Sequence, residues 1–161
     1  MNLTIRPIGD KDVDAVQLAL YAAVTWDRDD APPREVAVHH PELLKYWQGW
    51  GRPGDFGAFA DVDGVCVGAA YARTYSETDG SYGFVAADIP EISIGVLASH
   101  RGKGVGRMLL ARLETTARRA GFTRLSLSVN HENPARALYV DVGYEEIDSD
   151  ESSVRMIKHL P

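Results

Sequence analysis

The chain has 161 residues, of which 45% are hydrophobic and 25% charged, and its formal net charge is −6 at pH 7. This length and apolar content predict a single domain spanning residues 1–161 with a core of its own. The acidic balance, with no basic stripe interleaved with aromatic residues, argues against a nucleic-acid partner. No stretch reaches the roughly 18 apolar residues of a membrane span, and the start has no secretion signal, so we expect a cytoplasmic protein without a membrane partner.

Strands and helices are predicted from the spacing of apolar residues and from turn signals. The first half holds a strand at 3–7, helices at 11–24 and 41–49, and strands at 56–62 and 65–75. The second half holds a strand at 91–97, a helix at 104–120, a strand at 124–130, a helix at 134–141, and strands at 144–149 and 153–160. Strand, helix and strand over 91–130 imply a right-handed crossover with two parallel strands. We therefore predict an α+β fold, in which a mixed, mostly antiparallel twisted sheet contains a central parallel strand pair and is flanked by helices.

Aromatic residues gather between positions 25 and 55, and one more lies in the loop before the strand at 91–97. They include Trp26, Tyr46, Trp50 and Tyr82. Aromatic side chains on loops are suited to walling a substrate pocket, and this is one interpretation. The other is that the tryptophans pack against the sheet from a short helix, as the three-residue spacing of Trp47 and Trp50 indicates.

Polar and apolar residues alternate on both predicted parallel strands. Glu91, Ser93 and Gly95 share a face of the first strand, and Ser126 and Ser128 share a face of the second. Central parallel strands are normally apolar on both faces. The polar face is therefore either the wall of a cleft, along which a slender chain lies, or a half-solvated face of the sheet.

The most informative stretch is the loop between the strand at 91–97 and the helix at 104–120. It reads Arg101-Gly102-Lys103-Gly104-Val105-Gly106-Arg107. Closely spaced glycines let backbone N–H groups approach a ligand, and a helix start offers unpaired donors at the positive end of its dipole. The loop therefore predicts a phosphate-binding site, with an ordinary glycine-rich turn as the alternative. It lacks the hydroxyl residue of a Walker loop and the spacing of a dinucleotide fingerprint.

A second motif follows the strand at 124–130. It reads Asn130-His131-Glu132-Asn133-Pro134-Ala135 and leads into a short helix that contains Tyr139. Asn133 is a good N-cap, and Pro134 suits the first helical position. This helix is expected near the carboxyl ends of the parallel strands, where ligands of open sheets tend to bind.

These motifs together resemble the GNAT superfamily of N-acetyltransferases. The resemblance rests on Ile94 to Val96 leading into Arg101-x-x-Gly104-x-Gly106, on Asn130-x-x-Asn133, and on Ala137-Leu138-Tyr139 with Gly143-Tyr144. It implies that acetyl-coenzyme A is the cosubstrate and that the glycine loop holds its pyrophosphate. It also implies that the pantetheine arm pairs with the backbone near Val96 and Leu97, where the two parallel strands splay apart. The implied contact residues are Val96, Leu97, Arg101, Gly102, Lys103, Gly104, Val105, Gly106, Arg107, Asn130, Asn133 and Ala135.

Acyl transfer to an amine needs a base, an acid and a donor for the carbonyl oxygen. An alkyl amine has a pKa of about 10.4 and arrives charged, so a carboxylate must take its proton directly or through water. Glu91, at the start of its strand, is the candidate base. Tyr139, which the resemblance places near the thioester sulfur, is the candidate acid because a phenol stays protonated at neutral pH. The N–H of Val96 or Leu97 is the candidate donor.

The acceptor remains open between a small-molecule amine and a peptide amine. The histidines and the single cysteine, Cys66, show no metal-ligand spacing, so no metal is predicted. The family resemblance makes a homodimer plausible, through the closing segment at 144–160. Two alternatives are kept: a coenzyme A-binding sensor without turnover, and a binder of another nucleotide phosphate.

Overall fold

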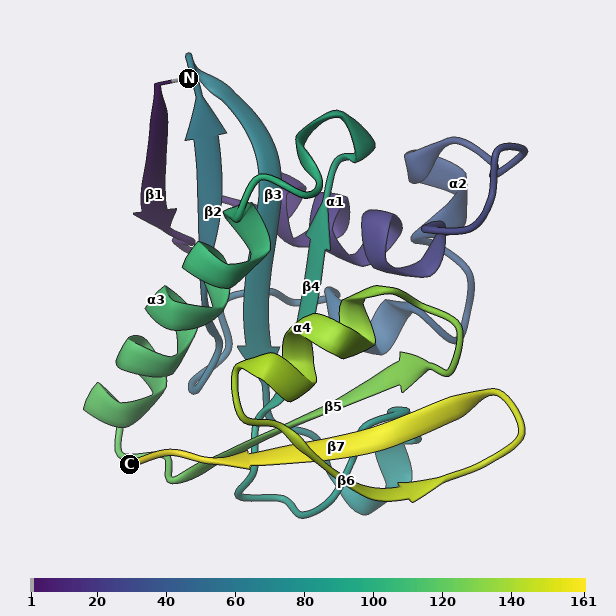
Figure 1. The fold of residues 1–161 in the computed structure, drawn as a ribbon, viewed down its shortest axis with the longest axis vertical. Coiled ribbons are helices and arrows are strands. Elements are labelled where there is room, and N and C mark those ends of the chain that lie inside the picture. The colour runs from purple at the N-terminus through teal and green to yellow at the C-terminus, as the bar shows by residue number, and fades with distance from the viewer. Residues whose placement is uncertain (1) are drawn as a thin grey trace.

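The computed structural model describes residues 2–161, which build a seven-stranded sheet in the order β1-β2-β3-β4-β5-β7-β6 (Figure 1). Its strands are β1 (Leu3–Pro7), β2 (Phe56–Val62), β3 (Val65–Arg73), β4 (Glu91–Val96), β5 (Arg124–Asn130), β6 (Glu145–Ser149) and β7 (Ser153–His159). Only the β4–β5 pair is parallel among the described strands. The predicted α+β fold with a central parallel pair is confirmed.

Helices cover both faces of this sheet. The helices are α1 (Val13–Val24), α2 (Arg34–Ala37), α3 (Val105–Arg119) and α4 (Ala135–Asp141), with 3₁₀ turns at Leu44–Tyr46, Glu77–Asp79 and Ala98–His100. Side chains alternate between the two faces along β3, so that Ala69 and Tyr71 pack with α1 while Ala70 and Ala72 pack with α3. The sheet therefore has a buried layer on each side, with α1 behind it and α3 in front in the view of Figure 1.

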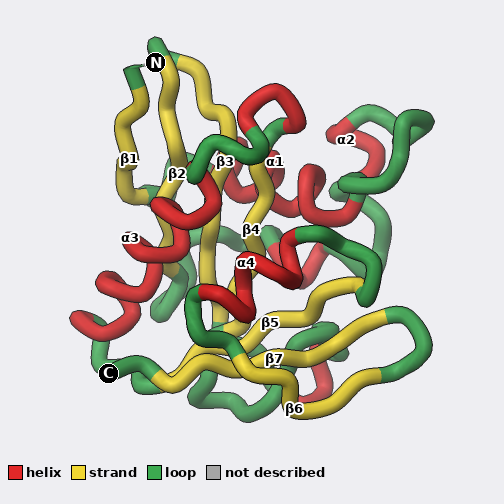
Figure 2. The backbone as a smooth tube through the Cα atoms, viewed as in Figure 1, coloured by secondary structure: helices red, strands yellow, loops and turns green. Residues whose placement is uncertain are grey.

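The predicted helix at 41–49 is wrong. The structure has only the 3₁₀ turn at Leu44–Tyr46 there, and it has a short helix, α2, at Arg34–Ala37 that the sequence analysis did not predict. Gly49 adopts a left-handed backbone with φ of 68°, which ends any helical run. The carbonyls of Lys45 and Gln48 accept hydrogen bonds from the side chain of Arg73 instead of serving a helix. Figure 2 shows loops along most of the connection between α1 and β2.

The parallel pair is held together at one point. Glu91 and Ser126 form the single register pair recorded between β4 and β5 in the described chain. Beyond it the strands diverge, and β5 runs at a steep angle to β4 in Figure 1. Within residues 2–161 the two strands therefore share a register pair only at the Glu91 end of β4.

Helix α1 lies directly against the polar face of β4. A Cβ added at Gly95 would come within 2.3 Å of the Ala19 carbonyl oxygen, so only glycine permits this contact. Glu91 is 4% exposed and Ser126 is fully buried. The face is therefore covered rather than half-solvated at these positions.

No helix among residues 2–161 is both long enough and apolar enough to cross a membrane.

Candidate acetyl-transfer site

A cavity of about 1010 Å³ lies where β4 and β5 diverge. Its walls come from these two strands, from α4, from the end of α1 and from the glycine loop that opens α3. Residues from every predicted motif line it, as do Leu20, Ala23, Val24 and Leu43, which carried no signal in the sequence. The interpretation of the polar strand face as a cleft wall is supported by Ser93, Ser128 and Asn130 in this lining.

The glycine loop owes its shape to two left-handed residues. Gly102 and Gly104 have φ of 74° and 84°, and a Cβ at either position would meet nothing within 4 Å. These glycines are therefore needed for backbone conformation, not for packing room. Gly104 precedes the first residue of α3, so the N–H groups of residues 105–107 have no acceptor inside the helix. This open, donor-rich turn fits a diphosphate.

The basic side chains of this loop have different surroundings. The Arg101 Nε donates to the Val96 carbonyl at 2.9 Å, which ties the loop to the end of β4. Arg107 pairs with Asp141 at 2.5 Å, and its side chain is 56% exposed. Both arginines line the cavity, whereas Lys103 is outside the lining that the described residues form.

The two predicted amide donors at the end of β4 face opposite ways. The Leu97 N–H donates to the Val67 carbonyl at 2.8 Å, so it points toward β3. Successive N–H groups alternate in direction along a strand, which turns the Val96 N–H toward the gap beside β5. Val96 lines the cavity. Of the two, Val96 is the amide with a free approach from the cavity.

The motif after β5 curls around the cavity edge. Asn130, Asn133 and Ala135 all line the cavity. The Asn130 Oδ1 accepts the Glu132 N–H and the Asn133 Oδ1 accepts the Ala135 N–H, each at 2.9 Å. Helix α4 begins at Ala135 with Pro134 at its N-cap, so the predicted cap, Asn133, lies one residue before that position. The side-chain NH₂ of each asparagine is the group left to meet a ligand.

Glu91 brings a buried carboxyl group into the cavity. Its Oε1 has no hydrogen-bond partner within residues 2–161. Burial raises the pKa of this carboxyl to about 7, while the nearby Ser81 hydroxyl, Gly83 N–H and Lys45 ammonium act against that rise. The group therefore changes its charge near neutral pH, as a proton acceptor in catalysis must.

Tyr139 reaches the same cavity from α4. Its ring packs edge-on against Tyr144 with the ring centroids 5.9 Å apart. Burial raises the pKa of the Tyr139 hydroxyl well above its ordinary value. The hydroxyl therefore stays protonated at neutral pH, where it can donate.

Three of the four predicted acceptor residues meet at the cavity and one does not. Trp26, Tyr46 and Tyr82 line it. The Tyr46 ring stacks on Tyr82 at 6.0 Å, and its hydroxyl accepts the Tyr82 N–H at 2.8 Å. Trp50 packs edge-on against Tyr71, and its Nε1 donates to the Gly9 carbonyl at 3.1 Å. Trp50 follows the packing interpretation.

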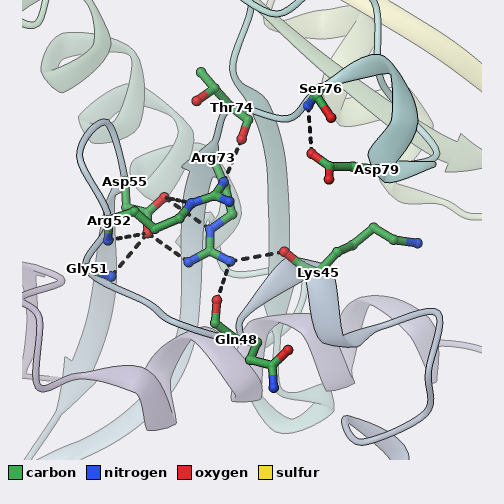
Figure 3. A network of polar contacts seen from close by, with 9 residues as sticks. All are labelled: Lys45, Gln48, Gly51, Arg52, Asp55, Arg73, Thr74, Ser76 and Asp79. Atoms are coloured by element: carbon green, nitrogen blue, oxygen red, sulfur yellow. Dashed lines mark hydrogen bonds and ion pairs between the residues drawn. The ribbon is translucent and has the colours of Figure 1, made fainter.

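A buried ion pair fixes the segment that carries Tyr46 (Figure 3). The Arg73 guanidinium bonds both carboxylate oxygens of Asp55, at 3.1 and 2.8 Å, and both side chains are 1% exposed. The same guanidinium donates to the carbonyls of Lys45 and Gln48 at 3.0 and 2.8 Å. The sequence analysis missed this role, although an arginine ending an otherwise apolar strand was a usable signal.

The chain is similar to known acetyltransferases. The model of the Acetyltransferase (GNAT) family matches residues 20–144. An uncharacterised N-acetyltransferase, YycN of Bacillus subtilis, is 42% identical over 55 residues, which are 34% of this chain and 35% of YycN. The ribosomal protein bS18-alanine N-acetyltransferase of Haemophilus influenzae is 36% identical over 56 residues, which are 35% and 38% of the two chains. The match thus spans little more than a third of either curated relative.

Solved structures share the whole fold. PaiA N-acetyltransferase of Thermoplasma acidophilum, in complex with coenzyme A, matches with a TM-score of 0.70 at 17% identity over 99% of both chains. YncA of Salmonella typhimurium, with acetyl-CoA, matches with a TM-score of 0.70 at 23% identity over 100% of this chain and 95% of that one. Because the family model covers most of the sequence and the fold agrees, this chain belongs to the GNAT family of acetyltransferases.

Proposed function

We propose that the chain is an N-acetyltransferase, which moves the acetyl group of acetyl-CoA to a primary amine by direct attack in a ternary complex. One observation carries the proposal. A buried carboxyl with an unpartnered oxygen, that of Glu91, lines the same cavity as Tyr139 and the glycine loop, within the described chain. A base, an acid and an anion-binding turn around one cavity are the set that this reaction needs.

The cosubstrate is held by the glycine loop and the two motifs beside it. The loop amides at residues 102–107 take the diphosphate, the Val96 N–H takes the thioester oxygen, and Asn130 and Asn133 line the edge. Acetyl-CoA supplies an acetyl group activated as a thioester. The structures solved with coenzyme A and acetyl-CoA, which share this fold, support the assignment.

Glu91 and Tyr139 move the two protons of the reaction. Glu91 takes a proton from the acceptor ammonium, directly or through one water, and leaves a neutral amine. The new bond joins the amine nitrogen to the acetyl carbon, and the bond that breaks joins that carbon to sulfur. Tyr139 gives its hydroxyl proton to the departing thiolate, and the second proton that the nitrogen loses on becoming an amide goes through water to the resulting Tyr139 phenolate. The first step needs a group that accepts a proton near neutral pH, and the Glu91 carboxyl has a pKa of about 7. Protonation of the thiolate needs a group that still holds its proton, and the raised pKa of Tyr139 meets that need.

The acceptor enters on the side of the cavity lined by Tyr46, Tyr82 and Trp26. We keep small-molecule and peptide amines as its two classes. One relative is by name an alanine N-acetyltransferase of ribosomal protein bS18, which supports testing peptide N-termini.

We also propose that residues 1–161 form a single domain which works in the cytoplasm as a homodimer. The free thiol of Cys66 suits a reducing compartment. Strand β6 is exposed along its whole length at the edge of the sheet, and it offers backbone groups to a second copy. Sedimentation at micromolar concentration checks the assembly, and a monomer at every concentration contradicts it.

Thiol release from acetyl-CoA, measured with a panel of amines and peptides, tests the activity. We expect turnover with at least one acceptor, and a loss of about 10² to 10⁴-fold in kcat for Glu91→Gln. Glu151→Gln, an exposed carboxyl, is the matched control and keeps full turnover. Coenzyme A binding by calorimetry without turnover of any acceptor overturns the proposal in favour of a sensor, and tighter binding of ATP or NAD overturns the choice of cosubstrate.

A further inference from the structure

Ser126 is a buried polar residue that the proposed reaction does not use. Its neighbours along β5, Ser128 and Asn130, line the cavity, whereas Ser126 does not belong to the lining formed by residues 2–161. Its hydroxyl donates to the Gly83 carbonyl at 2.8 Å, across 43 positions of sequence. Its backbone N–H donates to the Pro90 carbonyl at 3.0 Å. One residue thus holds both ends of the segment 83–90, which leads directly into Glu91.

The start of that segment lies against the carboxyl of Glu91. A Cβ added at Gly83 would come within 2.9 Å of the Glu91 Cδ and 3.0 Å of the Ser128 nitrogen. No methyl group fits between the segment, the carboxyl and β5. Gly83 is itself buried, so the segment 83–90 closes this side of Glu91 against water.

We propose that Ser126 is a positioning residue, which fixes Gly83 over the Glu91 carboxyl and so keeps that carboxyl out of water. The consequence for catalysis rests on the proposed function, because it assumes that Glu91 is the base. The structural part does not, since it concerns only how far water reaches the carboxyl. Water access decides how strongly a carboxyl holds its proton, so this contact sets the pH range in which Glu91 can act.

Other groups around Glu91 also influence its charge, and a test must leave them in place. They are Lys45 and Tyr46 of the 3₁₀ turn, Tyr71 and Arg73 of β3, Tyr75 after it, Ser81 before Gly83, and Arg155 of β7. Arg155 also donates to the Phe84 carbonyl, so it is a second anchor of the same segment. Ser126→Ala removes none of these groups and changes no charge. Its effect therefore reports on the position of the segment.

The direct measurement is the ¹³C carboxyl titration of Glu91 by NMR, with the signal assigned by its loss in Glu91→Gln. The wild-type midpoint is expected near pH 7. In Ser126→Ala the movement of Gly83 admits water to the carboxyl and also withdraws the Gly83 N–H, which acts against the raised pKa. Because burial is the largest cause of that rise, the midpoint is expected to fall, by about one pH unit or more, toward the value of a solvated carboxyl. Thr116→Val is the matched control, because it removes a hydroxyl that donates to a backbone carbonyl at 3.0 Å on α3, and its midpoint stays at the wild-type value.

Gly83→Ala tests the same contact without touching Ser126. The added methyl pushes the segment away from the carboxyl, and the midpoint is expected to fall as well. This variant decides the question if Ser126→Ala does not fold, as judged by circular dichroism. Unchanged midpoints in the folded variants overturn the proposal and leave Ser126 with a packing role.

Kinetics separate this inference from the proposed function. Where an acceptor is turned over, the acid limb of kcat/KM for the amine is expected to shift to lower pH in Ser126→Ala, in step with the titration. If the wild-type protein turns over no acceptor, the proposed function fails, and the titration still decides the role of Ser126. A lowered Tm with an unmoved acid limb contradicts the proposal.

Discussion

Glu91 and Tyr139 lie 48 positions apart in sequence, yet both side chains reach one cavity. Each of them was predictable, because a motif fixed its type and its place at a strand start or on a short helix. Trp50 was not, since its partners Tyr71 and Gly9 are brought to it only by tertiary contacts. At the scale of residues the sequence therefore predicts most of the side chains that reach the cavity, among them Trp26, Tyr46 and Tyr82, but not the tertiary contacts that divert a residue such as Trp50.

Tyr139→Phe tests the proton donor at the same scale. We expect kcat to fall by about 10²-fold, while the Kd of coenzyme A is unchanged, because only the proton for the leaving sulfur is lost. A thiol-release assay measures kcat, and calorimetry measures the Kd of coenzyme A. Tyr144→Phe is a close control, since the Tyr144 hydroxyl is also buried and has no partner within the described residues. Undiminished turnover in Tyr139→Phe removes this residue from the mechanism.

Among the elements, the strands were predicted well and the segment between α1 and β2 was not. Strand periodicity is local, so β1 and β5 begin and end where their patterns do. The segment 41–49 has helix-forming residues, but the Arg73 guanidinium of β3 donates hydrogen bonds to the carbonyls of Lys45 and Gln48. Such a contact, more than 20 positions away in sequence, leaves no trace in local periodicity.

The start of α3 gives a prediction for Gly104. Gly104→Ala places a side chain on a left-handed backbone, at a cost of roughly 1–2 kcal/mol, and distorts the turn that presents the amides. We expect coenzyme A binding, measured by calorimetry, to weaken about tenfold or more. Gly121→Ala is the matched control, because Gly121 has φ of 92° at the other end of the same helix and equally open space. It is expected to lower stability by a similar amount and leave the Kd unchanged; equal Kd values in both variants contradict the assignment.

The Asp55–Arg73 pair gives a second prediction at this scale. Asp55→Ala leaves a buried guanidinium without its counter-charge, and we expect the free energy of unfolding to fall by about 3–5 kcal/mol. Urea unfolding measures it. Glu146→Ala, which breaks the half-exposed pair with Arg136, is expected to cost less than about 1 kcal/mol. A small loss in Asp55→Ala shows that the segment 45–55 is held by other contacts.

For the whole molecule, Glu91 links stability to pH. Its pKa rises from 4.5 in the unfolded chain to about 7 in the folded protein. The folded state therefore binds the proton more tightly, so stability from this group is present below pH 4.5 and is lost as pH rises toward 7. The glutamine of Glu91→Gln does not titrate. The free energy of unfolding of this variant is therefore expected to gain on that of the wild type between pH 4.5 and pH 8, by on the order of 3 kcal/mol.

Urea unfolding of both proteins at the two pH values measures this difference, with Glu151→Gln as the exposed control. An advantage that is the same at both pH values contradicts the burial of a charged carboxylate.

The fold class was predictable at this scale because the crossover and the hairpin leave few ways to order the strands. The divergence of β4 and β5 was implied by the resemblance to the GNAT superfamily alone, since no residue pattern encodes it.

That divergence divides the sheet into two parts, one formed by β1 to β4 and the other by β5, β7 and β6. A single register pair within residues 2–161 joins the two parts. A molecule lying in the seam can supply backbone bonding that the strands do not give each other. The cosubstrate would then hold the two parts of the sheet together as well as react. Its release after each turnover would remove those hydrogen bonds. The two parts of the sheet are therefore expected to move more relative to each other after the cosubstrate leaves than while it is bound.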